Sequence, residues 1–137
     1  KIIPNSVEDM SWVTAAWGME MTLSRQVPEK IKNELKNFTD QIFKKAGLTY
    51  EEGINAVFFF FSGGPKIIDS VQAVLELKDE QITESRKILL ERGNMSSATL
   101  PHIWEEILNQ KYSVGTKVVS FAFGPGLTIF GSVFEVC

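Results

Sequence analysis

Apolar residues recur at helical spacing in the first half of the chain. One helix is predicted to open at Pro28, because proline is tolerated in a first turn where its missing N–H has no helical partner, and to end at Gly47. A second helix is predicted to open at Pro65. The apolar positions that form their buried faces are Ile31, Leu35, Phe38, Ile42 and Phe43 in the first and Ile67, Ile68, Val71, Val74 and Leu75 in the second.

Two further helical patterns flank a short turn, Gly93-Asn94-Met95-Ser96-Ser97. Before the turn, residues 78–92 carry a few apolar side chains among charged ones: Ile82, Leu89 and Leu90. After it, spacing of i, i+3, i+4, i+7 and i+8 predicts one buried helix face, formed by Leu100, Ile103, Trp104, Ile107 and Leu108. Gly93 suits a left-handed position that ends the first of these helices, and Ser96 or Ser97 suits the N-cap of the second.

Strand patterns occupy the remaining stretches of the chain. Residues 12–23 mix aromatic and methionine side chains with short polar ones, which predicts two short strands broken near Gly18. The continuous apolar run 56–61 predicts a strand covered on both faces. Residues 117–123 and 127–136 predict two more strands around a Gly-Pro-Gly turn. A strand followed by helices and further strands indicates α/β layering with a mixed sheet.

Composition narrows the class of protein. The chain has 137 residues, 44% of them hydrophobic, with ten phenylalanines and three tryptophans, which is enough to bury a core and argues against disorder. A net charge of −3 and a pI near 5.2 argue against nucleic acid or an anionic membrane as the main partner. The apolar runs are far shorter than the roughly 18 residues that cross a bilayer. The sequence therefore indicates one globular domain.

Two glycine-containing turns are candidate sites. An asparagine held between two packed helices presents an amide donor and acceptor from a fixed scaffold, so Asn94 is a candidate; alternatively it satisfies only the backbone of its own loop. Gly63-Gly64 follows the apolar strand and would let the backbone approach a ligand closely, unless it serves only as a tight turn. The spaced glycines and Lys-Ser/Thr pair of a phosphate-binding P-loop are absent.

Three motifs together resemble the C-terminal half of type III polyketide synthases, the chalcone and stilbene synthase family. They are Gly63-Gly64-Pro65, Gly93-Asn94-Met95-Ser96-Ser97 and Ala122-Phe123-Gly124-Pro125-Gly126-Leu127, where Ala122 replaces the first glycine of the family motif. The resemblance runs from about Ile3 to Val136 and makes residues 1–137 one domain. It implies an α/β fold, a thiolase-like half-domain with a mixed β-sheet packed with helices, from which the nucleophile-bearing N-terminal half is absent.

The resemblance implies decarboxylative condensation of coenzyme A thioesters. In the family a cysteine takes the acyl group, and a histidine and an asparagine stabilise the developing enolate oxygen. Asn94 matches the asparagine, whereas Phe61 stands in the position of the family histidine and Ser62 in that of its usual proline. Phenylalanine donates no hydrogen bond to an oxyanion, and loss of one such donor typically costs about 10²–10³ in rate. The resemblance therefore implies that this copy is severely impaired.

Binding residues are also implied by the resemblance. Gly63 and Gly64 would border the channel for the pantetheine arm of coenzyme A, with Ser96 and Phe123 as further substrate-binding positions. The paired strands before the Pro28 helix line the acyl-chain pocket in the family, so the bulky Trp12, Met19 and Met21 would approach it and make it shallow. Ordinary core packing of these three residues is the alternative.

Other reactive side chains are poor candidates. His102, the only histidine, follows Pro101 at the start of a predicted helix and is expected to be a surface or helix-end residue. Cys137, the only cysteine, excludes an internal disulfide, fits a reducing compartment and lies outside the family pattern for a nucleophile. One histidine and one terminal cysteine give no metal site, and no cofactor is expected beyond the coenzyme A thioester substrates.

The sequence thus predicts the C-terminal half of a type III polyketide synthase-like acyltransferase, inactive alone, that condenses malonyl-CoA with an acyl-CoA starter. The alternatives are a non-catalytic packing or dimerisation module derived from such an enzyme, and a ketoacyl synthase of the same fold. Expected partners are an N-terminal half or a second copy, with a homodimer in the full-length form, and neither nucleic acid nor membrane. The location is expected to be cytoplasmic. Because the sequence begins at Lys1 without Met, we expect a piece of a longer protein.

Overall fold

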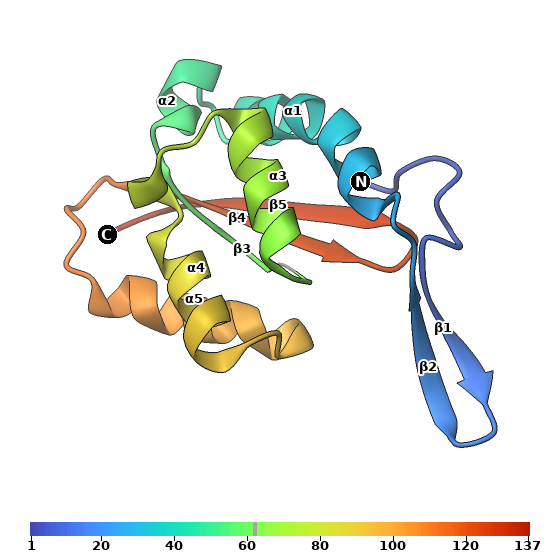
Figure 1. The fold of residues 1–137 in the computed structure, drawn as a ribbon. Coiled ribbons are helices and arrows are strands. Elements are labelled where there is room, and N and C mark those ends of the chain that lie inside the picture. Colours follow the sequence, from blue (N-terminus) through green and yellow to red (C-terminus); the bar gives the residue numbers. More distant parts are fainter. Residues whose placement is uncertain (62) are drawn as a thin grey trace.

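The computed structural model describes residues 1–61 and 63–137, so the comparison of Ser62 with the family's proline lies outside the described residues. A hairpin of two strands precedes a helical and sheet-forming body (Figure 1). The strands are β1 (Met10–Ala15), β2 (Gly18–Leu23), β3 (Val57–Phe60), β4 (Lys117–Gly124) and β5 (Thr128–Glu135). The α-helices are α1 (Val27–Lys45), α2 (Tyr50–Ile54), α3 (Pro65–Leu75), α4 (Thr83–Arg92) and α5 (Thr99–Asn109), and short 3-10 turns cover Asp79–Gln81 and Ser96–Ala98.

The sheet of the body is mixed, as the sequence predicts. Its order is β3-β4-β5, with β3 parallel to β4 and β5 antiparallel to β4. The parallel pair aligns Phe58 with Val119 and Phe60 with Phe121. The backbone N–H of Phe61 donates to the carbonyl of Phe121 at 3.0 Å, so the β3 ladder continues one residue beyond the strand. The fold is therefore α/β, with helices packed against a mixed sheet.

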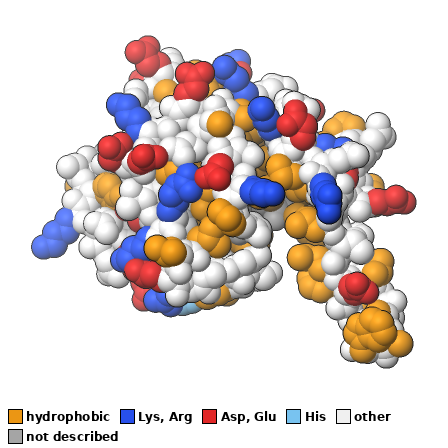
Figure 2. Space-filling model, viewed as in Figure 1, with side chains coloured by type: hydrophobic (Ala, Val, Ile, Leu, Met, Phe, Trp, Pro, Cys, Tyr) orange, Lys and Arg blue, Asp and Glu red, His pale blue; other side chains and the backbone are white. Residues whose placement is uncertain are grey.

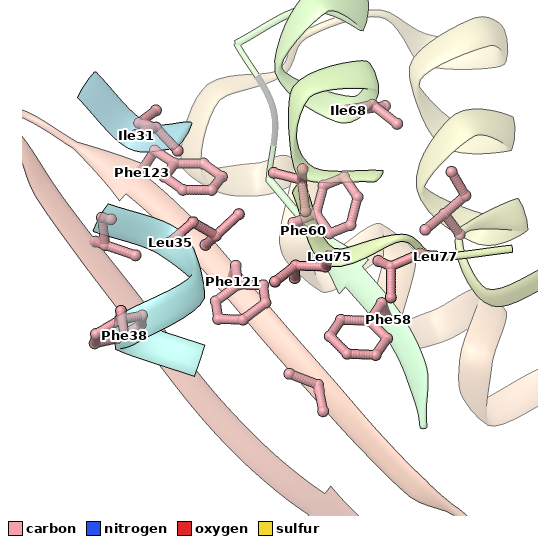
Figure 3. Packing of buried hydrophobic residues seen from close by; sticks show 14 of the residues in the cluster. Ile31, Leu35, Phe38, Phe58, Phe60, Ile68, Leu75, Leu77, Phe121 and Phe123 are labelled. Atoms are coloured by element: carbon pink, nitrogen blue, oxygen red, sulfur yellow. The ribbon is translucent and has the colours of Figure 1, made fainter. Parts of the chain in front are cut away.

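One face of the sheet lies under α1 and α3. Alternate residues of β3 and β4 point to this face, and Figure 3 shows them packed against the apolar sides of the two helices. The fully or nearly fully buried members include Ile31, Leu35, Phe38, Phe58, Phe60, Ile68, Val71, Leu75, Phe121 and Phe123. The predicted apolar faces of the Pro28 and Pro65 helices are thus confirmed, with Ile42, Ile67 and Val74 only partly buried. This face holds the main hydrophobic core.

The opposite face lies under α4 and α5 and carries a smaller cluster. Phe59 of β3 and Val118 of β4 meet Ile88 of α4 and Ile103 and Ile107 of α5. Phe59 and its neighbours Phe58 and Phe60 therefore belong to clusters on opposite sides of the sheet, which confirms the prediction of a strand covered on both faces. Ser85 of α4 anchors the helix to the sheet, because its hydroxyl accepts from the Phe60 N–H at 3.1 Å.

The prediction that α5 buries five apolar positions is wrong at two of them. Ile103 and Ile107 are buried, but Trp104 is 43% exposed and Leu108 is 84% exposed. The sheet covers only the Ile103–Ile107 side of the helix, so the stripe that the sequence indicates is wider than the surface available to bury it. The exposed half of the stripe remains as apolar surface.

The turn before α5 also differs from the sequence prediction. Neither Ser96 nor Ser97 caps α5; these residues lie in a 3-10 turn, Ala98 holds the N-cap position, and no side chain caps the helix there. The hydroxyl of Thr99 instead accepts from the Met95 N–H at 3.1 Å, which holds the turn from the helix side. Gly93 ends α4 with a φ of 71°, as predicted for a glycine, although its ψ of −162° is extended rather than left-handed helical.

The β1–β2 hairpin projects from the body (Figure 1). Its strands pair antiparallel, with Trp12 opposite Met21 and Ala15 opposite Gly18, which confirms two short strands broken near Gly18. Figure 2 shows hydrophobic side chains gathered on this projection. Trp12, Trp17, Met19 and Met21 are all exposed, so ordinary core packing of Trp12, Met19 and Met21 is wrong for this chain. None of the described helices is long and apolar enough to cross a membrane.

Candidate functional site

The Asn94 turn lies against the Gly63-Gly64 turn at the carboxyl end of β3. The side-chain amide nitrogen of Asn94 donates to the carbonyl of Gly63 at 3.4 Å. Its amide oxygen accepts from the Ser96 N–H at 2.8 Å. Asn94 therefore joins two turns that are 31 residues apart in the sequence. Of the two readings of Asn94, the loop-satisfying role is present, and the amide also lies where the two glycine motifs meet.

Phe61 lies two residues before Gly63 in the sequence. It follows the last residue of β3 and is held in place by its backbone bond to Phe121. Its side chain is half-buried, whereas the preceding Phe58, Phe59 and Phe60 are fully buried. Phe61 thus carries an aromatic ring with no hydrogen-bonding atom, and its alignment with a histidine stays a prediction. Gly63 and Gly64 belong to one of the two turns that meet at the Asn94–Gly63 junction, and Asn94 and Ser96 belong to the other. Contact of these residues with a substrate stays a prediction.

Helix α3 starts beside the junction. Gly64 occupies its N-cap position in extended backbone, Pro65 follows in the first turn, and no side chain caps the helix. The Ile67 N–H donates to the Gly64 carbonyl at 3.1 Å, which closes the first turn. A strand that leads through two glycines into a helix leaves backbone close to the surface at this point. The positive end of the α3 dipole is directed toward the same turn.

The predicted pocket residues of the hairpin and Phe123 do not share one surrounding. Trp12, Met19 and Met21 lie on the projecting hairpin. Phe123 is 5% exposed and packs among the core residues under α1, beside Ile31 in Figure 3. Contact of Phe123 with a substrate would require its side chain to leave the core, and the role of all four residues stays a prediction.

Among the residues that the structure describes, His102 and Cys137 form no hydrogen bond or ion pair with those of the Asn94–Gly63 junction. Nδ1 of His102 is 3.0 Å from an Arg92 guanidinium nitrogen and 3.7 Å from a Glu105 carboxylate oxygen. His102 lies in the first turn of α5, which confirms the predicted helix-end position. Cys137 is exposed at the end of the chain. Within the described residues, no group of three or more histidine, cysteine, aspartate or glutamate side chains is arranged to hold a metal ion.

An apolar hollow lies between α5 and β5. Its volume is about 520 Å³, and its lining residues are Phe59, Trp104, Ile107, Leu108, Gln110, Tyr112, Val118, Phe134, Glu135, Val136 and Cys137. Trp104 packs edge-on against Phe59 and Phe134, with ring centroids 6.1 Å and 6.2 Å apart. A surface hollow lined by several aromatic rings is typical of an interaction site rather than of solvent-facing surface.

A buried carboxylate adjoins this hollow through Tyr112. The Tyr112 hydroxyl donates to Oε1 of Glu84 at 2.8 Å, while Oε2 of Glu84 is buried with no hydrogen-bond partner among the described residues. Burial raises the pKa of Tyr112 to about 12, and the hydrogen bond to the Glu84 carboxylate and its negative charge add to this shift. Sequence reasoning missed this pair, because Glu84 reads as one more charged residue of a solvated helix.

The hollow itself has a signal in the sequence. Trp104 and Leu108 lie four residues apart and so share one side of α5. On β5, alternation places Phe130, Ser132 and Phe134 on the same face of the strand. An apolar stripe wider than the surface of one sheet indicates a second covering surface. Sequence reasoning assigned the whole stripe to one buried face and so did not find the hollow.

Comparison with known proteins gives consistent results. Residues 1–136 match the family model for chalcone and stilbene synthases, C-terminal domain. The chain is similar to type III polyketide synthase C of Arabidopsis thaliana, with 31% identity over 118 residues that cover 83% of this chain and 31% of that protein.

Solved structures with the same fold point the same way. The C-terminal type III polyketide synthase domain of Steely1 from Dictyostelium matches 99% of this chain and 38% of its own, with 26% identity and a TM-score of 0.89. CsyB complexed with CoA-SH matches 100% of this chain and 39% of its own with a TM-score of 0.89, and at 17% identity this likeness shows the fold alone. The chain spans 39% or less of each of these three proteins.

Proposed function

We propose that this chain, which belongs to the family of chalcone and stilbene synthase C-terminal domains, is the C-terminal half of an acyltransferase of the type III polyketide synthase kind. The reaction would be decarboxylative condensation of malonyl-CoA with an acyl-CoA starter. These thioesters would be substrates, with no resident cofactor. The half described here would contribute Asn94 and the glycine turns, and a separate or preceding N-terminal half would contribute the cysteine.

The observation that carries the proposal is the hydrogen bond between Asn94 and Gly63. It supports a site at the carboxyl end of β3, because it brings the asparagine motif and the Gly-Gly turn together with an amide group at their junction. A fixed amide donor that needs no reorganisation is the kind of group that stabilises a developing oxyanion. Membership of the chalcone and stilbene synthase C-terminal domain family supports this class of reaction and thioester substrate.

Phe61 sets the expected level of activity. It stands one residue beyond β3 beside this junction and offers no donor to an oxyanion and no charge to a thiolate. Asn94 alone would then stabilise the enolate oxygen. We therefore propose that the assembled protein binds thioesters but condenses them slowly, and that the chain alone does not catalyse condensation.

The test is a histidine introduced at Phe61 in the assembled protein. The N-terminal part of a type III polyketide synthase that carries the cysteine is co-expressed with this chain, and malonyl-CoA decarboxylation and product formation are measured. Phe61→His should raise both rates by about 10²-fold or more, since one oxyanion donor is typically worth that much. Asn94→Ala in the Phe61→His background should remove most of the gain, because both groups address the same oxygen.

Leu90→His provides the matched control. Leu90 is an exposed apolar residue of α4 that does not line the α5–β5 hollow, so its replacement adds an imidazole without adding a donor at the junction or changing the hollow. Its rates should equal those of the unchanged assembly. Equal rates for Phe61→His and the unchanged assembly would contradict the role assigned to this position. Turnover by the unassisted 137-residue chain would contradict the half-enzyme proposal itself.

A second candidate function is a non-catalytic packing module derived from such an enzyme. Phe61 favours it, and so does the apolar hollow between α5 and β5, which suits association more than chemistry. This function predicts that the assembly forms with unchanged affinity in Phe61→His and that neither rate rises. The same rate measurement therefore distinguishes the two functions.

A further inference from the structure

The outer edge of β5 carries the beginning of a further strand. β5 is the last strand in the order β3-β4-β5, and β4 pairs along one of its edges from Thr128 to Glu135. On the other edge, Ile2 forms an isolated antiparallel bridge with Thr128. The first residues of the chain therefore lie beside β5 as a short added strand, although β5 is near the other end of the sequence.

Hydrogen bonds fix the direction and register of this added strand. The Ile129 N–H donates to the Lys1 carbonyl at 2.8 Å, and the amino group of Lys1 donates to the Ile129 carbonyl at 2.6 Å. The Ile3 N–H donates to the Leu127 carbonyl at 2.8 Å. Lys1 and Ile129 thus form a hydrogen-bonded antiparallel pair, and the next pairs follow at every second residue.

Ser6 locks the end of this ladder. Its buried hydroxyl donates to the Ile3 carbonyl at 2.6 Å and accepts from the Leu127 N–H at 2.7 Å. Side-chain and backbone hydrogen bonds together therefore hold the start of the chain on β5. A change in its register would break a buried hydrogen bond. A strand that continued backward from Lys1 would enter the ladder with its register already set.

The rest of the β5 edge is open to such a strand. Backbone groups alternate between the two edges of a strand, so Gly131 and Val133 share the outward edge of Ile129. Val136, at the opposite parity, donates to the Thr116 carbonyl toward β4, which agrees with this alternation. No described residue forms a hydrogen bond with the outward backbone groups of Gly131 or Val133.

This open edge lacks the usual protection. Proteins commonly block exposed strand edges with charged side chains, proline or a bulge. The stretch from Phe130 to Phe134 contains no charged residue and no proline, and the β4–β5 register runs through it without a bulge. Phe130 and Phe134 are both exposed. An edge of this kind is a ready template for another strand.

We propose that the outer edge of β5 pairs with the polypeptide that directly precedes Lys1 in a chain of the relatives' length. That segment extends the antiparallel ladder of Lys1–Ile3, and its second and fourth residues before Lys1 lie opposite Gly131 and Val133. The existing ladder favours this occupant over a second copy, because it already delivers the chain to the edge in register. The chain matches a C-terminal domain and covers 31% of the Arabidopsis relative, so the relative's remaining length is expected mainly ahead of the matched region. The proposal does not depend on the condensation reaction.

Hydrogen exchange on an extended chain tests this proposal. The N-terminus is lengthened by the roughly six residues, a typical strand length, that precede the matched region in the Arabidopsis relative. Amide exchange of Gly131 and Val133 is then followed by NMR in both chains. Exchange at both amides should slow by about tenfold or more in the extended chain, since a paired edge opens less often. The Val119 amide of β4 reports whether the sheet is intact and should not change.

A proline control separates pairing from simple coverage. Proline at the second and fourth residues before Lys1 removes the N–H groups that would donate to the Gly131 and Val133 carbonyls and places its rings against the β5 edge. This extension should therefore not pair, and Gly131 and Val133 should exchange as in the original chain. Unchanged exchange in the extended chain, equal slowing with the proline extension, or loss of Val119 protection would each overturn the proposal. Slowing in the original chain that grows with protein concentration would overturn it in favour of a second copy.

Discussion

The two faces of the sheet differ in how completely they are covered. Under α1 and α3, side chains such as Phe58, Phe121 and Ile68 are fully buried, and the face is closed. Under α4 and α5, Phe59 is buried but Trp104 and Phe134 are about half exposed around a hollow of about 520 Å³. The same sheet thus has one closed face, covered by α1 and α3, and one open face, which α4 and α5 cover only in part.

This difference separates residues that hold the domain together from apolar residues that the chain leaves uncovered. The closed face needs only elements of this chain, so its side chains are expected to determine stability. The open face keeps a stripe of apolar side chains that α4 and α5 do not cover, and a patch of that kind marks an interaction surface. The chain spans 31% to 39% of the length of the relatives it matches.

The largest expected effect compares one phenylalanine on each face. Phe121 of β4 is fully buried in the closed face, whereas Phe134 of β5 is 46% exposed at the hollow. Phe121→Ala should lower the free energy of unfolding by about 3–5 kcal/mol, the usual cost of emptying a buried phenylalanine site. Phe134→Ala should cost about half of that or less, because much of its ring is already in water. Urea denaturation of both variants measures the two changes.

Equal losses would break the comparison. They would mean that the open face is as important for the stability of the isolated chain as the closed one. A larger loss for Phe134→Ala would place the principal core between α5 and β5. Only a larger loss of unfolding free energy for Phe121→Ala than for Phe134→Ala is consistent with one closed and one open face.

A smaller expected effect concerns the pKa values of the two tyrosines, of which one lies on each face of the sheet. Tyr50 packs beside Phe43 of the closed core, with ring centroids 5.8 Å apart, and Tyr112 packs beside the hollow. Burial and, for Tyr112, the hydrogen bond to Glu84 raise both pKa values, that of Tyr112 to about 12 from 10.0. Because the folded state holds the Tyr112 proton more tightly, the stability it contributes is present below pH 10 and is lost as pH rises through about 12.

Absorbance titration of phenolate in a Tyr50→Phe variant isolates Tyr112, since the chain has two tyrosines. Adding Glu84→Gln should lower the pKa of Tyr112 part of the way toward 10.0, because burial, the larger cause, remains. A pKa near 10.0 in the folded Tyr50→Phe chain would show that Tyr112 is solvated, and the hollow would then be more open than the geometry indicates.

The sequence predicted the closed face better than the open one. The faces of α1 and α3 follow from residue spacing, because both helices bury one stripe against a sheet of the same chain. On α5 the same rule assigned Trp104 and Leu108 to the core, since spacing shows that a stripe is apolar but not whether its covering surface is in the chain. The Glu84–Tyr112 pair lay beyond sequence reasoning, because it joins residues 28 apart through tertiary packing alone.

The candidate site shows the same division. The glycine motifs predicted where the Gly63 and Asn94 turns occur, and the structure joins them by a hydrogen bond. The predicted N-cap at Ser96 or Ser97 is wrong, because the 3-10 turn of Ser96–Ala98 sets where α5 begins. The pairing of Lys1–Ile3 with β5 also had no local signal, since it depends on a contact across nearly the whole chain.

We propose that an N-terminal half covers the hollow between α5 and β5, and its binding to paired leucine variants tests this central claim most directly. Leu108 lines the hollow and is 84% exposed, while Leu90 of α4 is 88% exposed and does not line it. The dissociation constant of the complex with the cysteine-bearing half is measured by calorimetry for Leu108→Lys, Leu90→Lys and the unchanged chain. Leu108→Lys should weaken binding by about tenfold or more, since burying one leucine contributes about 1.5–3 kcal/mol, and Leu90→Lys should leave it unchanged. Equal affinities for the two variants would contradict the proposal that an N-terminal half covers the α5–β5 hollow.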